Sequence, residues 1–204
     1  MARSLLTSNT DYYVSNTGSD ANDGSLAFPW ASLNHAYNTI RDTLDLAGKK
    51  VTTHVNNGTY SPFIAFGRCV GQARAQDVTF TGNPADSWTC AITATGENAI
   101  SVDADARLRM EGFSPRASGC VPFGFGVAVI EGVIEFGGMG WINCSSGFIT
   151  AAGARSQVNF VGGPAILSGA PGAFIAEGGA RIFAQNINGV TIGPLHFSVA
   201  FLIV

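Results

Sequence analysis

The stretch that decides the fold is residues 100–136, ISVDADARLRMEGFSPRASGCVPFGFGVAVIEGVIEF. Short apolar runs at residues 100–102 and 127–130 each lead into a three-residue step, Asp105-Ala106-Arg107 and Glu131-Gly132-Val133. A second apolar run follows each step. Runs of this length, rich in Val and Ile and bounded by Gly, Asp or Ser, predict strands. The stretch therefore predicts strand, tight corner and strand, twice over.

The same step recurs further along the chain, as Gly153-Ala154-Arg155 and Gly179-Ala180-Arg181. The third residues of the four steps are then Arg107, Val133, Arg155 and Arg181, separated by 26, 22 and 26 residues. A repeat of this length, with short strands and glycine corners but no helix, predicts a solenoid. Leucine-rich repeats would show Leu-x-Leu, and propeller blades need about 40 residues or more. We therefore predict an all-β parallel β-helix, in which equivalent side chains stack about 4.8 Å apart.

Strands are predicted both within this stretch and on either side of it. They cover residues 11–15, 51–55, 78–80, 100–102, 108–110, 127–130, 133–136, 148–150, 158–160, 174–176, 181–183, 190–192 and 197–201. One amphipathic helix is predicted ahead of most of these strands, because apolar residues recur there at helical spacing. The stripe consists of Leu33, Ala36, Tyr37, Ile40, Leu44 and Ala47. Pro29 stands ahead of this helix and Gly48 is its predicted stop.

Composition excludes several classes of protein. The chain of 204 residues is 12% charged and 46% hydrophobic and contains 26 glycines. Disordered chains are polar and highly charged, and coiled coils are rich in Glu, Lys and Arg. The glycines follow no collagen period, and no apolar stretch is long enough to cross a membrane. The net charge of -3 argues against a nucleic-acid partner, which requires a basic stripe.

The chain divides by composition near residue 50. Residues 1–50 are an ordinary polar mixture with the entry strand, a loop and the helix, whereas residues 51–204 are the predicted coils. No linker separates the two parts, so we expect one structural domain. Cys69, Cys90, Cys120 and Cys144 lack the spacing of a metal site, and we expect free buried thiols. The N-terminus lacks the apolar core of a secretory signal, so we expect synthesis in the cytoplasm.

The entry segment carries a resemblance to a known family. Tyr12-Tyr13-Val14-Ser15-Asn16-Thr17-Gly18-Ser19-Asp20, with Asn22-Asp23-Gly24-Ser25 and Pro29-Trp30-Ala31-Ser32-Leu33, resembles the start of right-handed parallel β-helix (pectin-lyase-like) proteins. Asn57-Gly58-Thr59-Tyr60 is similar to that family's step into the first coil. The match covers about residues 11–66. It implies a right-handed solenoid whose open N-terminal end is capped by the helix.

The resemblance also implies a function. The glycine-rich, lysine-poor coils are most similar to phage or prophage tail spikes and appendages, which bind or cleave surface polysaccharide. We therefore expect a structural or receptor-binding, virion-associated protein that contacts bacterial surface polysaccharide, without a cofactor. One alternative is a polysaccharide lyase or glycoside hydrolase. Another is a passive spacer with no ligand.

Asp105 and Glu131 are the candidate catalytic residues. The predicted repeat places them at one position of adjacent coils, so their carboxyl groups would lie about 5 Å apart. That separation suits a retaining glycosidase. Glu135 is predicted to pair with Arg109 across the coils. The alternative is that these side chains are a solvated corner that keeps the coil soluble.

Arginines and tryptophans are the candidate ligand-binding residues. Arg155 and Arg181 would stack next to the acidic pair and face an acidic sugar. Trp88 and Trp141 would stack on sugar rings if they are exposed, and Trp88 lies in a long loop at residues 83–89. His35, His54 and His196 are far apart in the chain and are expected to be structural.

Two further features complete the expectations. The loop Asp20-Ala21-Asn22-Asp23-Gly24 is similar to a calcium loop, but its spacing is one residue short and the closing glutamate is missing, so no metal is expected. The chain ends within an apolar strand, and an open sheet edge invites pairing. We expect further coils or a partner subunit, such as a homotrimer, to cover this end.

Overall fold

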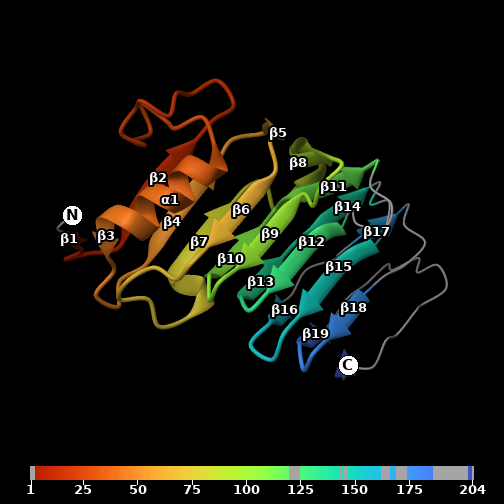
Figure 1. The fold of residues 1–204 in the computed structure, drawn as a ribbon. Coiled ribbons are helices and arrows are strands. Elements are labelled where there is room, and N and C mark those ends of the chain that lie inside the picture. The colour runs from red at the N-terminus through yellow and green to blue at the C-terminus, as the bar shows by residue number, and fades with distance from the viewer. Residues whose placement is uncertain are drawn as a thin grey trace.

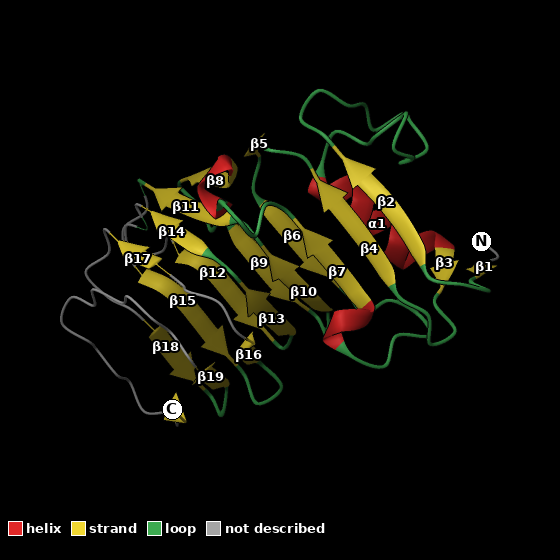
Figure 2. Cartoon of the chain, turned by 180° about the vertical axis from the view of Figure 1, so that it is seen from behind, coloured by secondary structure: helices red, strands yellow, loops and turns green. Residues whose placement is uncertain are grey.

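Short parallel strands make up most of the molecule. The computed structural model describes residues 3–119, 125–142, 144, 147–161, 166–168, 174–185 and 202–203. Within these residues there is one α-helix, α1 (Leu33–Thr43), and two short 3-10 helices, η1 (Ala75–Asp77) and η2 (Ser87–Thr89). The remaining regular structure is strand, which confirms the predicted all-β class (Figures 1 and 2).

The largest sheet has eight strands, all paired in parallel. In spatial order they are β2 (Thr10–Val14), β4 (Val51–Val55), β7 (Val78–Thr81), β10 (Arg107–Glu111), β13 (Val133–Gly137), β16 (Gln157–Val161), β19 (Arg181–Gln185) and β20 (Leu202–Ile203).

Two further sheets and two strand pairs complete the molecule, again with parallel pairing. The five-stranded sheet contains β6 (Phe63–Phe66), β9 (Ile100–Asp103), β12 (Phe125–Ile130), β15 (Gly147–Ala152) and β18 (Phe174–Glu177). The three-stranded sheet contains β5 (Gly58–Tyr60), β8 (Cys90–Thr95) and β11 (Ser114–Ser118). The pairs are β1 (Ser4–Leu5) with β3 (Leu44–Asp45), and β14 (Gly140–Ile142) with β17 (Ile166–Ser168).

The chain visits the three sheets in a constant order. It runs from β4 through β5 to β6, then from β7 through β8 to β9, and then from β10 through β11 to β12. Each passage goes from the eight-stranded to the three-stranded to the five-stranded sheet. Residues one passage apart therefore lie side by side, as Met110 does with Phe80 and with Phe136.

Most of the predicted strands that fall on described residues lie within observed strands, and the prediction for β4 matches its bounds. No strand is predicted from the sequence at β1, β3, β5, β6, β8, β11, β14, β17 or β20. The predicted strands at residues 190–192 and 197–201 lie outside the described residues.

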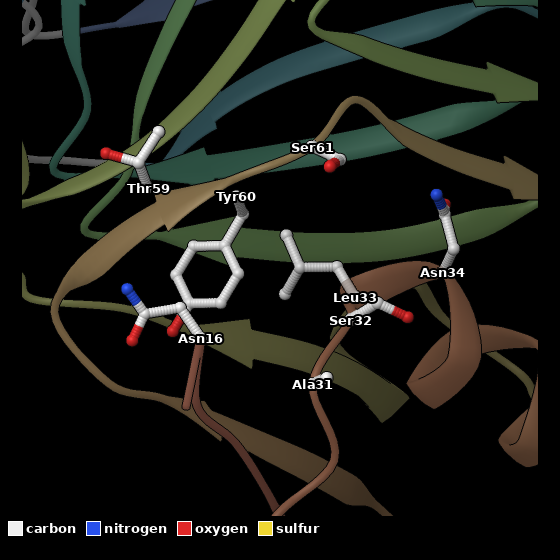
Figure 3. A pocket seen from close by; sticks show the side chains of 8 residues that line it. All are labelled: Asn16, Ala31, Ser32, Leu33, Asn34, Thr59, Tyr60 and Ser61. Atoms are coloured by element: carbon white, nitrogen blue, oxygen red, sulfur yellow. The ribbon is translucent and has the colours of Figure 1, made fainter. Parts of the chain in front are cut away.

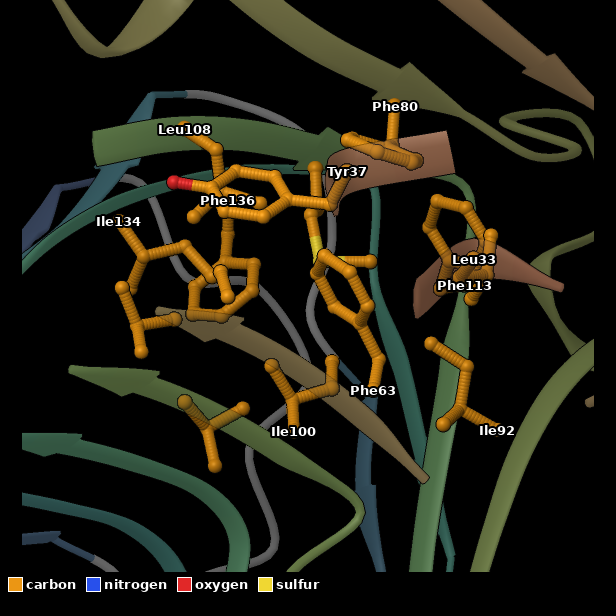
Figure 4. Close-up of a cluster of buried hydrophobic side chains, with 14 of the residues drawn as sticks. Leu33, Tyr37, Phe63, Phe80, Ile92, Ile100, Leu108, Phe113, Ile134 and Phe136 are labelled. Atoms are coloured by element: carbon orange, nitrogen blue, oxygen red, sulfur yellow. The ribbon is translucent and has the colours of Figure 1, made fainter. Parts of the chain in front are cut away.

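The interior is filled by the side chains that alternate with exposed ones along each strand. β4 alternates buried and partly exposed residues from Val51 to Val55, which is the period of two that a strand dictates. Rings from α1 and both large sheets meet at one point, where Phe80 lies 5.2 Å from Phe63 and 6.5 Å from Tyr37 between ring centres (Figure 4). All three are fully buried, so the two large sheets share one core.

The helix has the predicted buried face, made by Leu33, Ala36, Tyr37 and Ile40. Ser32 caps its start, because the Ser32 hydroxyl accepts a hydrogen bond from the backbone N–H of His35. The helix ends at Thr43 rather than near Gly48, because Leu44 and Asp45 pair with β1 as strand β3. Strand pairing thus ends the helix about one turn before the predicted stop.

The N-terminal edges of the two large sheets are covered. The edge of β2 is covered by the loop after it, because the backbone of Tyr13 bonds to Gly24 and Trp30. The edge of β6 faces α1, where the Asn34 side chain accepts from Ile64 N–H and donates to the Pro62 carbonyl. Edge backbone groups that are paired in this way cannot recruit another chain.

Three of the four cysteines fall on described residues. Cys69, Cys90 and Cys144 are buried thiols that form no disulfide, as predicted, and Cys120 lies outside the described residues. Burial raises the pKa of all three thiols, to about 11 for Cys69 and Cys144 and about 12 for Cys90. In the described part of the chain, no helix has the length and apolar composition needed to cross a membrane.

Candidate functional site

The candidate carboxylates lie on the corner between the five-stranded and the eight-stranded sheet. The backbone N–H of Asp105 donates to the carbonyl of Glu131 at 2.6 Å, so the predicted adjacency of the two residues is confirmed. Both residues have left-handed backbones, with φ of 62° and 55°. Glycine fills the equivalent corner after β15, at Gly153, with φ of 94°. Two acidic residues thus stand where glycine is the residue of lower strain.

Each of these carboxylates is paired with arginine. Asp105 accepts from Arg107 at 2.9 Å and lies 3.8 Å from a second guanidinium, that of Arg68. Glu131 lies 3.8 Å from Arg155, whose side chain is 76% exposed. The corner therefore carries a row of opposite charges, which matches the solvated-corner interpretation better than a free acid and base.

The predicted stacking of Arg155 on Arg181 is wrong. Arg181 pairs with Gln157, which in turn pairs with Val133. The corner between β15 and β16 spans residues 153–156, whereas the corner between β12 and β13 spans only residues 131–132. Within the longer corner, the buried Ser156 hydroxyl turns inward and accepts the Glu131 N–H at 2.7 Å. Arg155 belongs to this corner and faces solvent, so the two arginines do not form one subsite.

The outer face of the eight-stranded sheet is polar from β2 to β13, whereas the outward positions of β16 and β19 include Val161 and Phe183. Two columns of side chains alternate with the buried ones. The first column is Asp11, Thr52, Thr79, Arg109, Glu135 and Asn159, and the second is Tyr13, His54, Thr81 and Glu111. We call these two columns the polar face. Neighbours along a column are one strand apart, about 4.8 Å.

Hydrogen bonds link the side chains of the polar face. His54 Nε2 lies 3.0 Å from Asp11 Oδ1, and the His54 ring stacks on Tyr13 with ring centres 5.1 Å apart. Glu111 accepts from Thr81 at 3.1 Å and from Arg109 at 3.0 Å. Arg109 and Glu135 lie opposite each other as predicted. The ion pair of Arg109, however, is with Glu111 on its own strand.

The outer face of the five-stranded sheet is different in character. Its outward columns are Ile64, Ser101, Ala128, Thr150 and Ile175, and Phe66, Asp103, Ile130, Ala152 and Glu177. We call these two columns the apolar face. Phe66 is 58% exposed and Ile130 is 52% exposed.

Asp103 is a charged residue within the apolar face, and it stands between the exposed side chains of Phe66 and Ile130. Its Oδ1 atom is buried and has no hydrogen-bond partner. Burial raises the pKa of this carboxyl, against the effect of a backbone hydrogen bond from Ile130. A negative charge at this position is therefore disfavoured.

Trp88 lies in the predicted loop, which forms a rigid turn at the end of β7. Residues 84–88 and the turn at Gly138 and Met139 enclose a pocket of about 130 Å³. The Trp88 side chain is half-buried. The backbone of Trp141 lies in β14, and its side chain is outside the described part of the structure.

A second pocket of about 200 Å³ lies where the entry loop, α1 and β5 meet (Figure 3). Most of its polar groups form hydrogen bonds that hold the entry loop, α1 and β5 together. The Asn34 amide is used by β6, the Ser32 hydroxyl caps the helix, and the Tyr60 hydroxyl donates to the Asn56 carbonyl at 2.7 Å. We interpret this pocket as the seam by which the entry segment is attached.

The loop that is similar to a calcium loop has a structural role. The Asp20 carboxylate accepts from the backbone N–H groups of Ala31 and Ser32 at 2.8 and 2.9 Å. Partial burial opposes ionisation, but these bonds and the Ser32 hydroxyl hold the pKa of Asp20 below its ordinary value. No group of three or more His, Cys, Asp or Glu that could hold a metal ion occurs among the described residues.

His35 and His54, the two histidines in the described part of the chain, lie in different places and do not form a joint site. His35 lies on α1 with its ring edge against Trp30, and its Nε2 lies 3.3 Å from the Thr39 hydroxyl. His54 belongs to the polar face, which the sequence analysis did not identify. The available signal was the alternation of apolar and polar residues in Val78-Thr79-Phe80-Thr81. His196 lies outside the described residues.

Comparisons with known proteins give no match. No family model matches the chain, and neither the curated proteins nor the solved structures contain a match.

Proposed function

We propose that the chain is a right-handed parallel β-helix whose polar face binds bacterial surface polysaccharide, as part of a phage or prophage tail appendage. The parallel register and the constant order in which the chain visits the three sheets support the solenoid. The resemblance of the entry segment supports its hand and its class. The covered edges of β2 and β6 are what a cap at the first coil requires.

The polar face is the observation that carries the proposed function. It offers carboxylate, guanidinium, amide, imidazole and hydroxyl groups in columns with one strand between neighbours. A repeated array of donors and acceptors suits a polymer of repeated hydroxyl-bearing units. The stacked rings of Tyr13 and His54 add an aromatic surface at one end, and aromatic rings with a polar edge are well suited to sugars.

Binding is favoured over cleavage by the state of the corner carboxylates. A retaining glycosidase needs one carboxyl that is free to donate a proton and one that is free to attack. Asp105 is held by Arg107 at 2.9 Å, and Glu131 lies in a longer, exposed ion pair with Arg155 at 3.8 Å. A binding protein needs neither group to be free, so the arginine pairs are compatible with it.

An array of bacterial capsular and lipopolysaccharide glycans tests the proposal. We expect the 204-residue chain to bind at least one polysaccharide on the array without releasing reducing ends or unsaturated products. Absence of binding to every glycan would favour the passive spacer. Release of oligosaccharide that disappears in Asp105→Asn or Glu131→Gln would establish the enzyme instead.

Variants on the two faces locate the binding surface. The double variant Arg109→Ala with Glu111→Gln removes the centre of the polar face, and we expect it to weaken binding about tenfold or more, as loss of charge-assisted hydrogen bonds does. The matched control is Ser101→Ala with Thr150→Ala on the apolar face, which we expect to bind as the parent does. Equal losses in both variants would contradict a site on the polar face.

A homotrimer, or another partner at the C-terminal end, is part of the same proposal. Light scattering on the purified chain measures it directly. A monodisperse monomer would contradict it and would leave the polysaccharide site on the polar face as a property of the single chain.

A further inference from the structure

The pocket beside Trp88 is built more rigidly than a surface loop requires. Asn83 Oδ1 accepts from the backbone N–H groups of Ala85 and Asp86, at 3.2 and 3.1 Å. The same side chain donates to the Thr89 hydroxyl at 3.1 Å. Arg116 then donates to the Trp88 carbonyl at 2.9 Å. The loop is therefore held in one conformation before any ligand arrives, which lowers the entropy lost on binding.

Glycines allow this loop to lie directly on the neighbouring passage of the chain. A Cβ atom at Gly140 would lie 2.7 Å from the Ser87 hydroxyl and 3.1 Å from the Trp88 ring. A Cβ atom at Gly112 would collide with the backbone of Asn83 and Pro84. Only residues without a side chain allow so close an approach. The indole ring is thus pressed against the backbone of β14 and forms a fixed wall of the pocket.

The pocket combines an apolar floor with unused polar groups. Met139, which is 2% exposed, and the half-buried Trp88 provide the apolar surface. Asp86 and Ser87 also line it, and neither side chain has a hydrogen-bond partner among the described residues. Small-molecule sites have this composition, with an apolar lining and a few placed polar groups.

We propose that this pocket binds the acetamido group of an N-acetylated sugar within the polysaccharide, an inference that rests on the proposed function. A volume of about 130 Å³ holds roughly four water-sized atoms, at about 30 Å³ each. An acetamido group has that many non-hydrogen atoms. Its methyl group contacts Met139 and Trp88, its N–H donates to Asp86, and its carbonyl accepts from Ser87.

The free carboxylate of Asp86 selects this group over other small substituents. An O-acetyl group and the methyl group of a 6-deoxy sugar have no N–H to donate. Asp86 is exposed, so the preference comes from the charge-assisted hydrogen bond that an N–H group gains and that the other substituents cannot form. The pocket therefore predicts amino sugars that carry an acetyl group.

Isothermal titration with three tetrasaccharides tests the inference on the full chain. Chitotetraose carries acetamido groups, the matching glucosamine tetramer carries free amines, and cellotetraose carries hydroxyls. We expect chitotetraose to bind at least tenfold more tightly than cellotetraose. We also expect Asp86→Asn to reduce that preference several-fold, because a neutral amide is a weaker acceptor than a carboxylate.

A pocket-filling variant makes the test specific. Ala85→Leu places three further carbon atoms in the pocket and leaves the backbone bonds of the loop intact. We expect it to abolish the preference for chitotetraose. Ala73→Leu, at an exposed alanine before β7, is the matched control and keeps the preference.

The outcomes separate this inference from the proposed function. Equal affinity for chitotetraose and cellotetraose overturns the acetamido pocket, as does a preference that persists in Ala85→Leu. If the variant Arg109→Ala with Glu111→Gln still loses polysaccharide binding in that case, the binding site on the polar face is supported without the acetamido pocket. If the parent chain binds no oligosaccharide and no polysaccharide, both proposals are wrong.

Discussion

The polar face and the apolar face are made by the same passages of chain, yet their outward side chains differ in kind. Thr79 and Arg109 mark the first, whereas Ile64 and Ala128 mark the second. Inward, both sheets contribute to one core. The core therefore constrains every second residue, and the remaining positions are free to differ, with polar networks on one face and exposed side chains such as Ile64, Phe66 and Ile130 on the other.

The largest expected effect comes from the core that both faces share. Phe80→Ala removes a fully buried ring that touches Phe63 and Tyr37, and we expect a loss of about 3–5 kcal/mol in the free energy of unfolding. Urea unfolding followed by circular dichroism and by tryptophan fluorescence measures it. We expect one transition with both probes. Two separate transitions would mean that the faces belong to independently stable bodies.

A carboxylate on the polar face is expected to stabilise the fold. Glu111→Gln weakens the bonds from Arg109 and Thr81, and we expect a loss of about 1 kcal/mol in unfolding free energy. Thermal unfolding at neutral pH measures it. Glu135→Gln on the same face is the control, since Glu135 has no ion pair among the described residues, and it should lie within about 0.5 kcal/mol of the parent.

A substitution at the corner between the two faces is expected to raise the stability of the fold rather than lower it. Glu131→Gly relieves a left-handed backbone, and we expect a gain of about 0.5–1 kcal/mol, because the exposed ion pair with Arg155 contributes little. Differential scanning calorimetry measures it. Polysaccharide binding should be unchanged in this variant. A stabilised variant that no longer binds or cleaves polysaccharide would move the site from the polar face to the corner.

The smallest expected effect is the same carboxylate-to-amide change on the apolar face, with the opposite sign to Glu111→Gln. Burial raises the pKa of Asp103, so the folded state holds its proton more tightly than the unfolded state does. That contribution to stability is fully present below the unfolded pKa, about 3.9, and is lost as pH rises through the folded pKa. Asp103→Asn should therefore raise the melting temperature at pH 7, with a gain that shrinks toward pH 3. A variant that is destabilised at pH 7 would contradict this assignment.

Much of the fold was readable because inward residues repeat with the period of a strand. Leu108 and Met110, or Ile134 and Phe136, predict both a strand and its buried side. β5 and β8 were missed because Gly58-Thr59-Tyr60 is too short, and residues 90–95 are too uniformly small and buried, to show an alternation. Periodicity alone cannot detect such strands, since their pairing with neighbours defines them.

The candidate site was harder to predict, because it depends on register rather than on residue type. The adjacency of Asp105 and Glu131 followed from a corner of nearly constant length. Arg155 was misplaced because the corner after β15 is longer, and an extra residue or two is invisible in a weak repeat. The polar face was missed for the same reason: Thr52, Thr79 and Arg109 become one surface only after three passages are aligned.

The buried thiols can serve as probes of local unfolding. Cys69, Cys90 and Cys144 belong to three different passages of the chain, and burial keeps each of them in the unreactive, protonated form. An alkylating reagent therefore reaches a given sulfur atom only while the chain around it is open. The order in which the three sulfur atoms are labelled reports the order in which these passages separate, and so the end from which unfolding begins.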